Sequence, residues 1–279
     1  MPYVDLGEFT MFYTDEGDGP PVLCVHGWTC DGSDWSWQVP ALVPGHRVIV
    51  VDLRGHGRST APADGYGPLV FADDLAALLA RLGTGPVVAM GHSMGGATVV
   101  ALAVEHPELV RAVVSVDSAF GFDPAGLEGI AQFLDLLKAP GGNQVAKEFF
   151  ARFYPAACPP HLPVLHARRV EAMDHGALWK SFEGLLVRSF GEKPDAERYL
   201  PRVQCPVLTF RAGAEDPQSV AQWERAQFPN PYSKSVAWEG TGHFLHQERP
   251  AEFNAILLAW LSKLPESSRP EVPAAASAS

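Results

Sequence analysis

The feature that most constrains the fold is an alternation between short, Val-rich apolar runs and longer stretches with helical spacing. The apolar runs that we interpret as strands span residues 22–25, 47–51, 86–90, 113–116, 206–210 and 235–238. Each run is apolar at consecutive positions rather than at every second one, as expected when helices cover both faces of a sheet. Such runs separated by helices predict an α/β protein with a mainly parallel sheet.

Helical spacing and end signals add detail to this arrangement. The clearest predicted helices span residues 70–82, 93–105 and 250–264. Gly83 stands just past the first of them, and Pro250 stands at the start of the last, which are the usual places for these residues. Residues 4–6 and 11–13 are predicted to form a hairpin before the first parallel strand.

The segment at residues 119–200 breaks the alternation, because it contains helix-like pieces but no convincing strand. A structureless loop of that length would be unusual in a compact protein. We therefore predict a helical cap, inserted into a core made of residues 1–118 and 201–264. Residues 265–279 are rich in Pro, Ala and Ser and are predicted to be a disordered tail.

Charge and composition exclude several classes of partner. The chain has 32 acidic against 21 basic residues, a formal charge of −11. An acidic chain without a basic cluster is poorly suited to bind nucleic acid or an anionic membrane surface. No apolar run reaches the ~18 residues typical of a spanning helix, and no signal peptide is visible at the start. We expect a cytoplasmic protein with a small-molecule substrate; the oligomeric state stays open, with a homodimer as one outcome.

The cysteines and histidines indicate no resident metal or cofactor. The four cysteines are scattered without a C-x-x-C pair. The turn at residues 52–59 brings Asp52 and His56 close in sequence, but it offers no third ligand at a convincing spacing. We interpret this turn as structural.

A glycine-flanked serine follows the third parallel strand. The segment Gly91-His92-Ser93-Met94-Gly95 lies between a predicted strand and a predicted helix, the context in which G-x-S-x-G is typical of a nucleophile. Such a turn holds the serine in a strained conformation with its hydroxyl exposed. Ser93 is therefore the candidate nucleophile, and a phosphate-binding or purely structural turn is the alternative.

A base and an acid complete the candidate catalytic set. His243 follows the last predicted strand and is the better base, because His92 is expected to point away from the Ser93 hydroxyl. The base needs an acid to fix its tautomer. The chain order serine, acid, histidine admits two aspartates that follow strands. We choose Asp216 and keep Asp117 as the alternative.

Two backbone amides are placed to stabilise a developing oxyanion. Trp28 follows the strand that ends at His26-Gly27, and Met94 follows the candidate nucleophile. N–H groups at such positions can bind the oxygen of a tetrahedral intermediate. The predicted oxyanion hole therefore consists of the amides of Trp28 and Met94.

Taken together, these segments resemble the α/β-hydrolase superfamily over residues 20–118 and 203–262. The matching segments are residues 26–28, 52–59, 91–96, 213–216 and 242–244. The resemblance implies an eight-stranded sheet flanked by helices, a helical cap and a triad of Ser93, Asp216 and His243, without a cofactor. Epoxide hydrolases and dehalogenases of this superfamily use aspartate as nucleophile, so the serine argues against both.

The expected function is hydrolysis of a small, largely apolar carboxylic ester or lactone through an acyl-enzyme. The substrate pocket is predicted between the cap and the strand ends. Its predicted wall comprises Trp28, Met94, Phe120, Phe150, Tyr154, Trp179 and Phe244. Alternatives are a C–C bond hydrolase, a perhydrolase or a cofactor-free oxygenase or lyase that uses the same serine and histidine. A small-ligand receptor on a hydrolase fold is a further alternative.

Overall fold

A single sheet organises the computed structural model, which describes residues 2–186, 190–213 and 216–265. Its strands are β1 (Tyr3–Asp5), β2 (Thr10–Glu16), β3 (Pro21–Val25), β4 (Arg47–Asp52), β5 (Val87–His92), β6 (Val110–Val116), β7 (Val207–Gly213) and β8 (Lys234–Glu239). Their order is β1-β2-β4-β3-β5-β6-β7-β8. The β1–β2 and β2–β4 pairs are antiparallel and all others are parallel. The predicted eight-stranded, mainly parallel sheet and its hairpin are confirmed.

The helices connect these strands. They are α1 (Val39–Leu42), α2 (Pro68–Leu82), α3 (Met94–Glu105), α4 (Pro124–Lys138), α5 (Gly142–Phe150), α6 (His161–Ala172), α7 (His175–Leu185), α8 (Lys193–Tyr199), α9 (Pro217–Gln227), α10 (Leu245–Glu248) and α11 (Pro250–Leu261). The short 3-10 helices include η1 (Gly32–Trp35) and η3 (Ala151–Phe153). The three predicted helices correspond to α2, α3 and α11. Gly83 ends α2 with a φ of 58°, a conformation that favours glycine.

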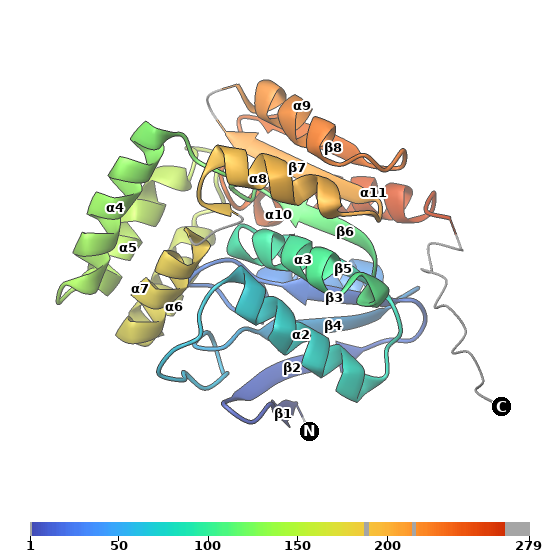
Figure 1. Cartoon of the computed structure of the whole chain (residues 1–279), viewed down its shortest axis with the longest axis horizontal. Helices are drawn as coiled ribbons and strands as arrows, with labels where there is room; N and C mark the ends of the chain where they lie inside the picture. Colours follow the sequence, from blue (N-terminus) through green and yellow to red (C-terminus); the bar gives the residue numbers. More distant parts are fainter. Residues whose placement is uncertain (1, 187–189, 214–215, 266–279) are drawn as a thin grey trace.

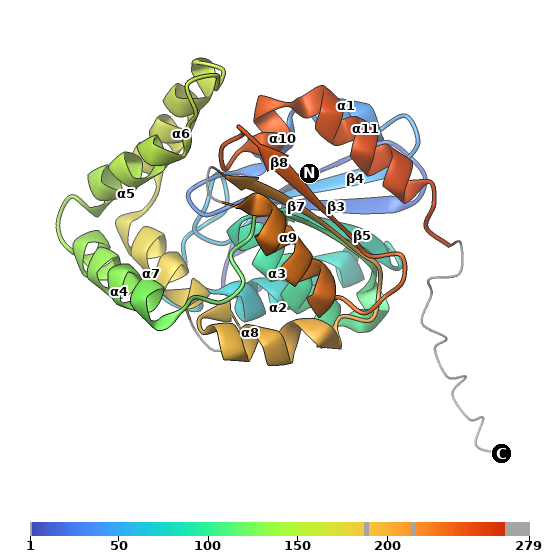
Figure 2. The same ribbon diagram turned by 90° about the horizontal axis from the view of Figure 1, so that it is seen from above.

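Helices cover both faces of the sheet. Figures 1 and 2 show α2, α3 and α8 on one face and α1 and α11 on the other. One buried apolar cluster includes Phe71 of α2 and Val99 of α3. A second includes Leu42 of α1 and Phe253 of α11. Because both faces are packed, the central strands carry apolar residues at consecutive positions.

The segment predicted as a cap is helical in its described part. Helices α4, α5, α6 and α7 lie to one side of the sheet, as Figure 2 shows, and α8 returns to the core. We call residues 119–200 the cap segment. Sequence spacing did not predict α8, which packs Ala196 and Tyr199 into the larger core cluster. Apart from residue 265, the predicted tail lies outside the described residues.

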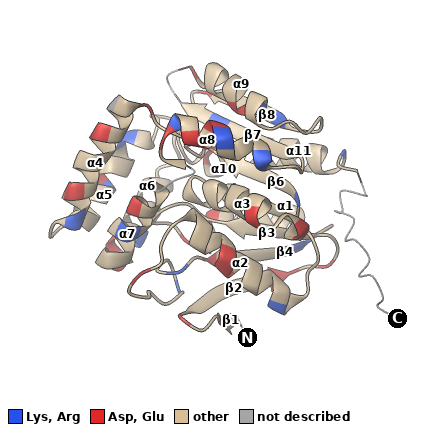
Figure 3. Cartoon of the chain, in the orientation of Figure 1, with Lys and Arg blue, Asp and Glu red and all other residues tan. Residues whose placement is uncertain are grey.

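Charged residues lie mainly on the helices and loops. Figure 3 shows the strands mostly tan, with blue and red residues along the cap segment and the outer helices. Among the described residues, no helix is long and apolar enough to cross a membrane.

Candidate active site

The candidate catalytic residues follow four neighbouring strands and lie at one edge of the sheet. Strands β5, β6, β7 and β8 are adjacent and parallel, so their carboxyl ends lie together. Ser93 follows β5, Asp117 follows β6, Asp216 follows β7 and His243 comes after β8. In sheets of this kind, sites are built at the carboxyl ends of the strands.

The serine sits on a sharp turn between β5 and α3. Its φ of 51° and ψ of −117° are unusual for a residue other than glycine, at a typical cost of about 1–3 kcal/mol. The flanking residues must be glycines because other backbone segments pass close to their Cα atoms. A Cβ on Gly91 would lie 2.1 Å from the Gly95 carbonyl oxygen, and one on Gly95 would lie 2.3 Å from that of Val25. The turn leaves Ser93 on the wall of a cavity.

The candidate base is paired with Asp117. His243 Nδ1 lies 2.6 Å from Asp117 Oδ2. An ionised carboxylate only accepts hydrogen bonds, so Nδ1 carries the proton and Nε2 keeps a lone pair. Ser93, Asp117 and His243 line the same cavity, of about 510 Å³. Among the described residues no hydrogen bond joins Ser93 to His243; such contacts often tighten only when substrate binds.

The choice of Asp216 as the acid is wrong in this structure. Asp216 is exposed and caps the amino end of α9, where its side chain accepts a hydrogen bond from the Ser219 amide. Pro217 occupies the first turn of that helix. An aspartate followed by proline is a common helix start, and that local signal could have identified Asp216 as a capping residue.

Asp117 is held in place from several directions. Its Oδ1 accepts a hydrogen bond from the Ala212 amide at 3.0 Å and lies 3.4 Å from Arg211 Nη1. Arg211 also bonds Glu224. Burial alone would raise the pKa of Asp117, but the His243 hydrogen bond and the charges of His243 and Arg211 outweigh it and lower that pKa. Asp117 is therefore ionised at neutral pH.

Two backbone amides near the serine are free to donate. Among the described residues, neither the Trp28 nor the Met94 amide donates a hydrogen bond to any group. A Cβ on Gly27 would lie 3.3 Å from Ser93 Cβ, so the loop that carries Trp28 packs against the serine turn. An oxyanion hole made by these two amides stays a prediction.

The cavity wall is aromatic and comes largely from the cap segment. Trp28 lies on it as predicted, and its indole Nε1 donates to the Leu178 carbonyl. The remaining aromatic wall includes Phe150, which the sequence analysis named, and five residues that it missed: Phe122, Phe133, Phe149, Phe153 and Phe182. Part of it follows helical spacing, since Phe149 and Phe153 lie four residues apart. Phe150 joins the wall through packing against Trp28.

The other predicted wall residues do not line this cavity. Phe120 packs against Phe190 and Phe228 inside the core. Phe244 is buried beneath His166, with ring centres 3.8 Å apart. In these two cases packing takes the aromatic ring away from the cavity.

Tyr154 and Trp179 lie on other surfaces. The Tyr154 hydroxyl bonds His166 Nδ1 at 2.7 Å, and the residue lines a separate cavity of about 380 Å³. Trp179 is half-buried, and the ammonium groups of Lys138 and Lys180 each contact its ring. Neither ring reaches the wall that Ser93 shares.

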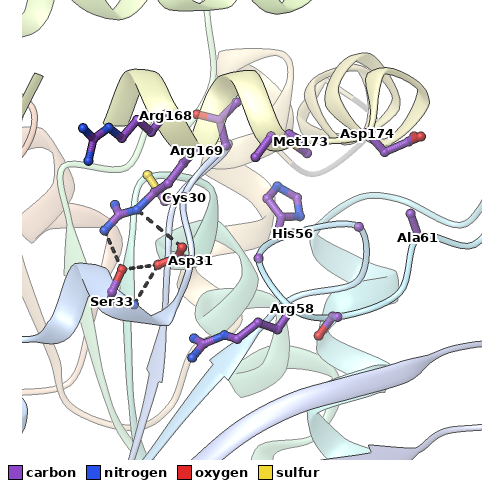
Figure 4. Close-up of a pocket in the computed structure, with 15 residues that line it drawn as sticks. Cys30, Asp31, Ser33, His56, Arg58, Ala61, Arg168, Arg169, Met173 and Asp174 are labelled. Carbon is purple, nitrogen blue, oxygen red and sulfur yellow. Dashed lines mark hydrogen bonds and ion pairs between the residues drawn. The ribbon is translucent and has the colours of Figure 1, made fainter. Parts of the chain in front are cut away.

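A larger cavity, of about 590 Å³, does not include any of the three candidate catalytic residues. Figure 4 shows Arg169 of α6 reaching Asp31 and Ser33 of the core across it. His56 and Arg58 form part of its opposite wall. Arg58 is bound to the buried Asp52, which also accepts from the Gly32 amide, so the turn at residues 52–59 has the structural role expected of it.

One cluster in the described part of the chain could be considered as a metal site. Asp34, His92 and His246 bring one ligand atom each within 4.8 Å of one another, and all three residues are buried. Arg169 already pairs with Asp34, so a divalent ion would bring uncompensated positive charge into the protein interior. The charges of the cluster do not fit a metal ion.

Comparisons with known proteins agree with this architecture. The model of the "Alpha/beta hydrolase family" matches residues 22–256. The chain is 28% identical over 255 residues to 2-(acetamidomethylene)succinate hydrolase of Mesorhizobium japonicum, covering 88% of this chain and 90% of that relative.

Solved structures are also similar. A thermophilic esterase from Thermogutta terrifontis is 26% identical, with a TM-score of 0.80, over 94% of this chain and 96% of the esterase. A bromoperoxidase from Bacillus anthracis is 25% identical, with a TM-score of 0.78, over 91% and 96% of the two chains. The chain therefore belongs to the alpha/beta hydrolase family of enzymes.

Proposed function

We propose that the chain is a serine hydrolase that cleaves a small, largely apolar carboxylic ester or lactone through an acyl-enzyme. The observation that carries the proposal is the 2.6 Å contact between His243 Nδ1 and Asp117 Oδ2, in the cavity that Ser93 lines. Similarity to a solved esterase supports ester hydrolysis. In this proposal Asp117 replaces Asp216 as the acid of the triad.

The reaction proceeds in two halves. His243 Nε2 takes the proton of Ser93, and the serine oxygen attacks the substrate carbonyl. The amides of Trp28 and Met94 bind the resulting oxyanion. His243 then protonates the leaving alcohol, and the acyl group remains on Ser93. Water, deprotonated by His243, releases the acid and restores the serine.

The cavity favours an apolar substrate of modest size. A volume of about 510 Å³ is within the range of small-molecule sites, and its wall is mainly apolar and rich in aromatic rings. Aromatic rings bury the acyl or alcohol group without providing hydrogen bonds. We therefore expect short aryl or alkyl esters and lactones to react faster than highly charged ones.

Labelling with a fluorophosphonate probe tests covalent catalysis directly. Mass spectrometry should find the label on Ser93 alone, and Ser93→Ala should remove both the label and turnover of an ester and lactone panel. The melting temperature of Ser93→Ala controls for folding. Full activity of this variant on the substrate that the wild type prefers would contradict covalent catalysis and favour oxygenase or lyase chemistry at His243.

Perhydrolysis is a second candidate, favoured by the similarity to the bromoperoxidase. Hydrogen peroxide would replace water as the group that attacks the acyl-enzyme, and a peracid would leave instead of the acid. We would measure peracid formation from an ester and hydrogen peroxide, with Ser93→Ala as the control. Hydrolysis without any detectable peracid would exclude perhydrolysis and leave ester hydrolysis as the one proposed reaction.

A further inference from the structure

Behind the serine, three buried side chains from separate segments point polar atoms at one another. Asp34 comes from η1, His92 is the last residue of β5 and His246 lies in α10. Asp34 Oδ2, His92 Nδ1 and His246 Nδ1 have no hydrogen-bond partner within the described part of the chain. One ligand atom from each of the three residues lies within 4.8 Å of the other two, and Asp34 Oδ2 and His92 Nδ1 are 3.9 Å apart. Buried polar atoms without partners are rare, and each one calls for a physical explanation.

The charge of this cluster indicates that any molecule bound between the three side chains, here called the guest, is neutral. Asp34 is ionised, because its pairing with Arg169 outweighs burial and lowers its pKa. Burial lowers the pKa of His92 well below its usual value and that of His246 to about 3, so both rings are neutral. Asp34 and Arg169 compensate each other and the two rings are neutral, and the additional negative charge of Asp31, which also contacts Arg169, is partly exposed to solvent.

Hydrogen-bond directions define what the guest must donate and accept. His92 Nε2 lies 2.9 Å from the His243 carbonyl oxygen, so Nε2 carries the proton and Nδ1 accepts. His246 Nε2 lies 3.5 Å from the side-chain amide nitrogen of Gln247, which can only donate, so the proton of His246 is on Nδ1. The guest therefore donates to Asp34 and to His92 and accepts from His246.

Water fits these requirements. It donates twice, and it accepts from His246 with a lone pair. Two hydrogen bonds of ordinary length at a tetrahedral angle separate their partners by about 4.6 Å. One ligand atom of each residue lies within 4.8 Å of the other two, and the 3.9 Å between Asp34 Oδ2 and His92 Nδ1 is short enough for one water molecule to bond both. A buried water of this kind typically makes about three hydrogen bonds.

We propose that one buried water molecule bridges Asp34, His92 and His246, and that it thereby fixes His92 as the donor that positions the His243 loop. The inference rests on the proposed function only in taking His243 as the base. His92 touches no reacting atom and acts through the His243 carbonyl, so it is a positioning residue.

The water also completes a hydrogen-bonded chain from the cap segment to that loop. The Tyr154 hydroxyl donates to His166 Nδ1 at 2.7 Å, and His166 Nε2 faces Gln247 Oε1 at 3.4 Å. Gln247 Nε2 in turn faces His246. Every step then has one donor and one acceptor, from Tyr154 through the water to the His243 carbonyl. A fully satisfied buried network of this kind rigidifies the groups that it joins.

A high-resolution crystal structure of the wild-type enzyme tests the water itself. We expect one spherical density peak, about 2.7–3.1 Å from Asp34 Oδ2, His92 Nδ1 and His246 Nδ1. Metal analysis of the same sample should find far less than one ion per chain. The proposal is overturned if side chains fill the space, or if a stoichiometric metal has contacts of about 2.0–2.2 Å. This measurement needs no turnover, so it remains decisive if the proposed ester hydrolysis fails.

A matched pair of variants tests positioning. His92→Phe keeps a ring but cannot donate to the His243 carbonyl, and we expect kcat to fall about 10- to 100-fold, because small misplacements of catalytic groups cost that much. KM should change much less than kcat. His92→Gln places an amide donor at similar reach and should recover most of kcat.

Melting temperatures separate positioning from loss of fold. Wild-type kcat in a folded His92→Phe, or an equal loss in both variants, would overturn the positioning role. If His92→Phe does not fold, wild type is compared with His92→Gln alone. A kcat near the wild-type value then supports the positioning role, and a large loss of kcat in folded His92→Gln overturns it.

Discussion

Asp117 and Asp216 follow neighbouring parallel strands and have similar backbones, with φ values of 50° and 40°. Their surroundings nevertheless differ completely. Asp117 is largely buried and receives hydrogen bonds from His243 and from the Ala212 amide. Asp216 is exposed and caps α9. A place at a strand end brings an acid to the correct edge of the sheet, but burial and partners decide whether it orients a base.

The largest expected effect is that of Asp117→Asn. The amide would donate hydrogen bonds of its own and allow His243 the tautomer that cannot accept the Ser93 proton, so kcat should fall about 10⁴-fold. The measurement is steady-state kinetics on the best substrate of the ester panel, with a melting curve to verify folding. A loss smaller than about tenfold would mean that Asp117 does not serve as the acid.

A smaller loss is expected when the support of Asp117 is weakened. Arg211→Lys keeps a positive charge, but a lysine cannot bridge Asp117, Glu224 and the Ser118 carbonyl as the guanidinium does. We expect kcat to fall about tenfold through misplacement of Asp117. Unchanged kcat in a folded variant would show that the Ala212 amide alone holds the carboxylate.

Lowering the pH should destabilise the fold through three buried histidines, His56, His166 and His246. Burial lowers the pKa of His56 and His246 to about 3 and that of His166 to about 4. The unfolded chain takes up these protons near pH 6.5, so below that value it binds more protons than the native state. The contribution of these histidines to the free energy of unfolding is therefore fully present above about pH 6.5, and it falls as the pH drops toward 4.

The dependence of stability on pH should be steep between the unfolded and native pKa values of these histidines. Each such histidine contributes up to about 1.4 kcal/mol per pH unit to the free energy of unfolding. Guanidinium chloride unfolding at pH 7 and pH 5 measures it, and His56→Asn should reduce the slope because one of these groups is removed. Equal free energies of unfolding at the two pH values would contradict the neutral, buried state of these rings.

The smallest expected effect is that of changes at Asp216. Asp216→Asn keeps a good helix cap and should alter neither kcat nor the melting temperature. Asp216→Ala loses the hydrogen bond to the Ser219 amide and should lower the melting temperature slightly, with kcat/KM within about twofold of wild type. A large loss of kcat in either folded variant would contradict the assignment of Asp117, rather than Asp216, as the acid.

Local sequence signals predicted the parts of the site that short segments encode. The serine turn needs only glycines that allow close backbone approach between a strand and a helix, and all of these lie within residues 91–96. The position of His243 after the last strand follows from chain order. The aromatic wall was predicted poorly, because Phe120 and Phe244 turned out to pack in the interior. Aromatic composition alone does not distinguish a cavity wall from a core.

The sequence by itself determined the parallel α/β sheet, the strained serine turn and the histidine after the last strand. Each of these depends on residue patterns within a short stretch of chain. Only the tertiary structure decided which aspartate meets His243, which phenylalanines face Ser93, and that Asp34, His92 and His246 converge. These contacts join residues that are far apart in the chain, and strand order and cap packing bring them together. No local pattern encodes such distances.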